Sequence, residues 1–157
     1  NAIFIAQKYY LSNLIDRYNK LTSFLKDKDL EIISTAIGVI LADANSARKH
    51  LIRPAKEQLD KLIQDENFQK LMCNKIENNL CNKKNINEFV DLLCDYRGII
   101  EIVENLKSPL LEKLKNYDVM DLSEEKHYKL SLLINEDEEM HFFRYIGSLI
   151  LYSFEKK

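Results

Sequence analysis

The stretch that decides the fold is Leu30 to Ala44, with the sequence LEIISTAIGVILADA. Ten of its fifteen residues are apolar, and on a helical wheel they fall on every side. A surface helix needs a polar face, so a helix of this kind has to be buried by its neighbours on most sides. Its small residues Ser34, Thr35 and Gly38 would let other helices approach its backbone closely. We therefore expect a central helix wrapped by the rest of the chain.

Apolar residues at helical spacing predict more helices before and after this stretch. The clearest runs from Phe4 to Lys26, where a bundle-type seam repeats at spacings of 3 and 4. Asp29 is placed to cap the central helix, Pro54 to start the next one, and Gly98 to allow close helix packing. Two capping boxes are expected, Asp121 with Glu124 and Asn135 with Glu138. The other helices are expected at 55–64, 68–80, 86–106, 110–117, 124–134 and 136–154.

The composition predicts an all-α protein. Only three glycines and two prolines occur in 157 residues, too few for the many turns of a β-protein of this size. A chain of this length usually forms one domain and can bury a core without a metal or a disulfide. We therefore expect a single-domain bundle, 1–157, of about six to eight helices around Leu30–Ala44. The chain does not begin with Met, which would also suit a fragment of a longer protein.

The charge balance bears on possible partners. The net charge is −2, from 23 basic and 25 acidic residues spread along the chain. This gives no general attraction to nucleic acid or to an anionic membrane. No stretch is apolar for long enough to span a bilayer, and no signal peptide is recognisable. We accordingly expect neither a nucleic-acid partner nor a membrane span.

The cysteines indicate a reducing compartment. Cys73, Cys81 and Cys94 are odd in number and form no CxxC pair. Cys73 and Cys81 are two helical turns apart, which is too far for a disulfide. We expect three reduced, mostly buried thiols in a compartment such as the cytoplasm, although a secreted effector domain is also compatible with the sequence.

Two patterns raise the question of a metal site. The first is Glu124-x-x-His127 together with Glu138-x-x-His141, which resembles half of a di-iron carboxylate site. The motifs begin fourteen residues apart, each in the first turn of its own helix. Antiparallel neighbours this close in sequence begin at opposite ends, beyond the reach of one ligand sphere. Glutamates in a first turn are expected for helix capping, so we predict no metal here.

The second pattern is a set of acidic pairs three residues apart. Such pairs on facing helices hold Mg²⁺ in all-α nucleoside triphosphate pyrophosphatases. Here an ExxD precedes an ExxE, the reverse of the order in those enzymes, and the chain is 31% charged, so solvated faces produce such pairs by chance. These pairs support our alternative hypothesis, a metal-dependent all-α hydrolase. The pairs are Glu57 with Asp60, Glu88 with Asp91, and Glu101 with Glu104, the last two being the alternative metal-site residues.

Other catalytic motifs are absent from the sequence. It contains no GxSxG, no phosphate-binding P-loop and no Arg-x₄₋₆-His of helical ribonucleases. His50 stands alone near a helix end, and no cysteine has a histidine near it in sequence. We assign no catalytic residue, cofactor or small-molecule ligand.

The last helix offers a candidate surface. Phe142 to Phe154, FFRYIGSLILYSF, carries a single charge and two apolar stripes. We predict that Ile146 and Ile150 are buried while Tyr145 and Tyr152 stay partly exposed, since the stripes lie about 100° apart. Tyrosine is enriched at interfaces because its rigid apolar ring ends in a hydroxyl. The candidate partner-binding residues are Tyr145, Tyr152, Phe142, Leu149, Tyr9 and Tyr10.

These observations favour a non-enzymatic helical protein-binding module. The class includes inhibitors or immunity proteins, adaptors, and domains of bacterial effectors, with another protein or a second copy as partner. A metal-dependent enzyme is the alternative. A DNA-binding regulator is disfavoured because the chain is nearly neutral and lacks a basic recognition helix.

Overall fold

The apolar stretch forms helix α2 (Leu30–Asp43), capped as expected by the Asp29 carboxylate, which accepts a hydrogen bond from the Glu31 backbone N–H at 2.9 Å. The computed structural model describes residues 2–136 and 139–156, with the side chains of all of these except 3–4, 6–12, 136 and 154–156. The described residues form nine α-helices and two 3-10 turns, and contain no strand. The all-α prediction is confirmed.

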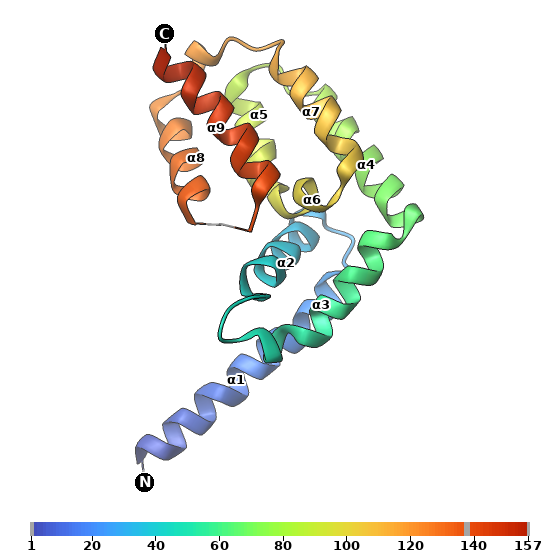
Figure 1. The fold of residues 1–157 in the computed structure, drawn as a ribbon, viewed down its shortest axis with the longest axis vertical. Helices are drawn as coiled ribbons and strands as arrows, with labels where there is room; N and C mark the ends of the chain where they lie inside the picture. Colours follow the sequence, from blue (N-terminus) through green and yellow to red (C-terminus); the bar gives the residue numbers. More distant parts are fainter. Residues whose placement is uncertain (1, 137–138, 157) are drawn as a thin grey trace.

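The first three helices form the lower part of the molecule in Figure 1. Helix α1 (Ala2–Phe24) packs against α3 (Lys49–Gln64) and α2, and its N-terminal half extends beyond the other helices. Pro54 lies inside α3 and does not begin it, contrary to the prediction. Its position is the sixth of the helix, so the missing N–H removes the bond to His50, which is exposed.

The middle of the chain departs from the sequence prediction. After α4 (Glu66–Cys81), the expected helix 86–106 is divided into α5 (Ile86–Asp95), α6 (Arg97–Ile102) and the 3-10 turn η1 (Glu104–Leu106). The breaks fall at Tyr96 and Val103, both with non-helical backbone angles. Leu71 on α4 is 49% exposed.

The C-terminal part consists of α7 (Lys107–Leu114), the 3-10 turn η2 (Val119–Asp121), α8 (Glu124–Glu136) and α9 (His141–Lys156). Helix α9 packs against α8 and α6. Neither predicted capping box forms as expected. Ser123 takes the role of Asp121, with its hydroxyl accepting a hydrogen bond from the Lys126 N–H. Asn135 lies within α8, and Glu138 is outside the described residues.

The two halves meet where α2 crosses α6. The Ser34 hydroxyl on α2 accepts hydrogen bonds from the N–H groups of Gly98 (2.9 Å) and Ile99 (3.2 Å) at the start of α6. A Cβ placed on Gly98 would lie 2.2 Å from the Ser34 carbonyl oxygen. The predicted role of Gly98 in close packing is confirmed, and Ser34 caps a helix distant in sequence. This capping explains why α6 begins anew at Arg97.

Helix α2 is central, as predicted. It contacts α1, α3, α5 and α6, and its inward residues Ile33, Ile37 and Ile40 are almost completely buried. One side remains open, because Ile32 and Val39 are 37% and 36% exposed. The buried core continues from α1 through α2 to α9 as one cluster of apolar residues.

Candidate functional site

The carboxylates of the alternative metal site do not come together. Each is engaged by protein groups. Glu88 accepts a hydrogen bond from the Lys84 N–H (2.6 Å), and Glu104 pairs with Lys107 (2.8 Å). Among the residues that the structure describes, no group of three or more His, Cys, Asp or Glu is placed to hold a metal ion.

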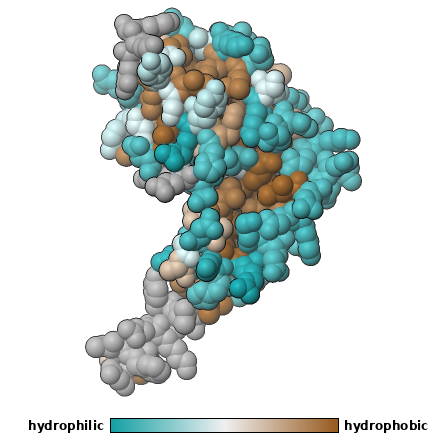
Figure 2. Space-filling model, in the orientation of Figure 1, coloured by the Kyte–Doolittle hydropathy of each residue, from teal (hydrophilic) through white to brown (hydrophobic). Residues whose placement is uncertain are grey.

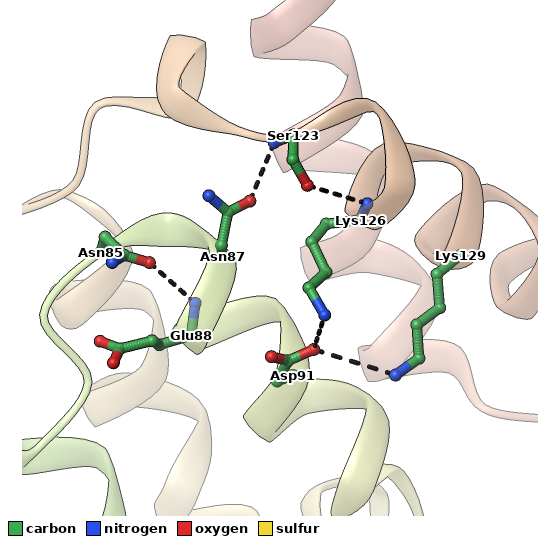
Figure 3. Close-up of polar contacts among 7 residues, drawn as sticks. All are labelled: Asn85, Asn87, Glu88, Asp91, Ser123, Lys126 and Lys129. Carbon is green, nitrogen blue, oxygen red and sulfur yellow. Dashed lines mark hydrogen bonds and ion pairs between the residues drawn. The ribbon is translucent and has the colours of Figure 1, made fainter.

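Asp91 takes part in a network that joins α5 to α8 (Figure 3). Its carboxylate lies 2.7 Å from the Lys126 ammonium and 3.9 Å from that of Lys129. The hydrogen bond to Asp91 raises the pKa of Lys126. Beside it, the Asn87 side chain accepts a hydrogen bond from the Ser123 N–H (2.9 Å) and donates one to the Asp121 carbonyl (3.0 Å). These contacts fasten the start of α8 to α5, a structural role.

Glu101 has a structural role that the sequence did not predict. Its Oε2 atom accepts hydrogen bonds from the N–H groups of Phe142 (2.9 Å) and Phe143 (3.1 Å), at the N-terminus of α9. A carboxylate here satisfies unpaired N–H groups and complements the helix dipole. The cap comes from another helix, 41 residues earlier, so no local motif could have indicated it.

The thiols of Cys73 and Cys94 are poorly suited to nucleophilic chemistry. Burial raises the pKa of Cys94 to about 11, and burial together with the nearby Glu77 carboxylate raises the pKa of Cys73. Both are therefore protonated near neutral pH, whereas the reactive form of cysteine is the thiolate. All three cysteines are free, and Cys81 is exposed, which corrects the expectation of mostly buried thiols.

The two stripes of α9 lie as the helical angle predicts. Ile146 and Ile150 are fully buried, while Tyr145 and Tyr152 are 54% and 56% exposed. Phe142 differs from the prediction because it is buried. The Lys107 ammonium lies over the Phe142 ring, 5.4 Å from its centroid, and the centroid of the Tyr145 ring, on the same helix, is 6.4 Å away.

A groove lies between α7 and α9, with Tyr145 and Leu149 on its α9 wall. Its volume is about 780 Å³. The face shown in Figure 2 has apolar side chains gathered between these two helices, whereas polar ones cover most of α3 and α4. Tyr152 lies on the same stripe of α9 but outside the groove, and the side chains of Tyr9 and Tyr10 are outside the described residues. The opposite wall combines apolar and polar side chains, namely Leu111, Leu114, Tyr117 and Val119 with Lys107, Ser108, Glu112 and Lys115.

A second groove, between α1 and α2, was missed by the sequence reasoning. Its volume is about 820 Å³, and Phe24, Ile32 and Val39 line it at 36–39% exposure. At one end the Tyr18 hydroxyl donates to Asp43 (2.5 Å) and accepts from Arg48 (3.4 Å). Burial and the bond to Asp43 raise the pKa of Tyr18. The apolar residues on every side of α2 were the available signal, but they were interpreted only as burial on most sides, with no groove predicted.

Comparison of the chain with protein-family models, curated proteins and solved structures finds no match. Within the described part of the chain, no helix combines the length and the apolar character needed to cross a membrane.

The engaged carboxylates lead to a prediction about metals. We expect added Mg²⁺, Mn²⁺, Zn²⁺ or Fe²⁺ to leave the melting temperature unchanged, as measured by circular dichroism. A metal at 100 times its Kd would stabilise the fold by about 2.7 kcal/mol, which a melting curve detects easily. A clear rise with one metal, abolished in Glu101→Gln or His141→Ala, would contradict this prediction and favour the hydrolase hypothesis.

Proposed function

We propose that the protein is a non-enzymatic helical protein-binding module and that its partner docks in the groove between α7 and α9. The observation that carries the proposal is the placement of Tyr145, more than half exposed, in the wall of a groove that also contains Leu111, Leu114 and Leu149. An exposed aromatic ring beside apolar side chains with polar groups around them is typical of a surface that becomes buried in a complex.

The shape of the groove favours a helical segment of the partner. Two roughly facing helices supply its walls, and Leu111, Leu114 and Leu149 provide apolar contacts. An amphipathic helix recognises such a groove through apolar side chains at positions i, i+3, i+4 and i+7. The Tyr145 hydroxyl remains able to make a polar contact at the rim. An inhibitor or immunity protein, an adaptor and an effector domain would each use such a surface.

The proposal is tested by removing both rings. We expect the Tyr145→Ala/Tyr152→Ala double variant to lose its partner and to keep its fold. The cost in stability should be small, because the rings are about half exposed and the contact of Tyr145 with Phe142 is of a kind that contributes about 0.5–1.5 kcal/mol. Affinity capture from the source cells with mass spectrometry measures binding, and urea unfolding measures stability.

Tyr128→Ala is the matched control, since Tyr128 is 66% exposed on α8, outside the groove. A protein retained by the wild type and by Tyr128→Ala, but lost by the double variant, would support the proposal. Two results would refute it. One is equal capture by all three proteins. The other is a loss of several kcal/mol in the double variant, the cost of about 3–5 kcal/mol known for truncating buried aromatic rings.

A further inference from the structure

We draw no further inference here: the strongest candidate, the groove between α1 and α2 that has the hydrogen-bonded Tyr18 and Asp43 at one end, carries none because nothing in the structure shows what covers it.

Discussion

Ile37→Asp should abolish folding. Ile37 is completely buried at the middle of α2, beside Gly98 of α6. Truncating a buried aliphatic side chain costs about 2–5 kcal/mol. An unpaired carboxylate at this place adds a penalty of several kcal/mol. Whole domains are stable by about 5–15 kcal/mol, so the variant should lose its cooperative melting transition and most of its helical circular dichroism signal.

Val39→Asp is the control for this experiment. Val39 lies two residues further along the same helix, is 36% exposed and lines the α1–α2 groove. A carboxylate there remains hydrated, so the variant should fold and melt close to the wild type. If Ile37→Asp melted like Val39→Asp, α2 would not be the centre of the fold.

The sequence predicted those features that depend on neighbours along the chain. The apolar residues of α2 identified the central helix, and Asp29 was recognised as its cap because the N–H it binds is two residues away. The break before α6 was not predicted. It depends on Ser34, which lies 64 residues before Gly98 in the chain. The Ser34 hydroxyl accepts a hydrogen bond from the Gly98 N–H. Only tertiary structure brings these groups together. The spacing of apolar residues within 86–106 does not indicate the contact.

The same distinction applies to the candidate surfaces. Tyr145 and Ile146 were assigned correctly to outside and inside because helical rotation alone separates them. Phe142 was assigned wrongly to the outside, because the Lys107 side chain that lies over its ring comes from another helix, α7. The α1–α2 groove was missed for a further reason. Apolar residues such as Ile32 and Val39 look alike in sequence whether a neighbouring helix covers them or leaves them open.

The α2–α6 crossing gives the second large expected effect, in Gly98→Ala. The added Cβ would lie 2.2 Å from the Ser34 carbonyl oxygen and 3.0 Å from the Gly38 nitrogen. Both are backbone atoms, so no change of rotamer relieves the clash, and the two helices have to separate. The separation would also weaken the hydrogen bonds from Gly98 and Ile99 to the Ser34 hydroxyl. Overpacking typically costs about 1–3 kcal/mol, and we expect this rigid contact to reach at least the upper value.

Gly38→Ala, on the other side of the same crossing, shows whether the rigidity of the contact is the cause. Its added Cβ would lie 3.2 Å from Met140 Cε and 3.8 Å from Arg97 Nε, both near the ends of flexible side chains that can move. Alanine is also favoured over glycine within a helix by about 1 kcal/mol. Urea unfolding should therefore show Gly38→Ala near or above the wild type and Gly98→Ala well below it. Equal stability of the two variants would mean that α2 and α6 do not cross at this distance. The closeness of Gly98 to the Ser34 carbonyl would then not explain why glycine occupies a helical position where alanine is intrinsically better.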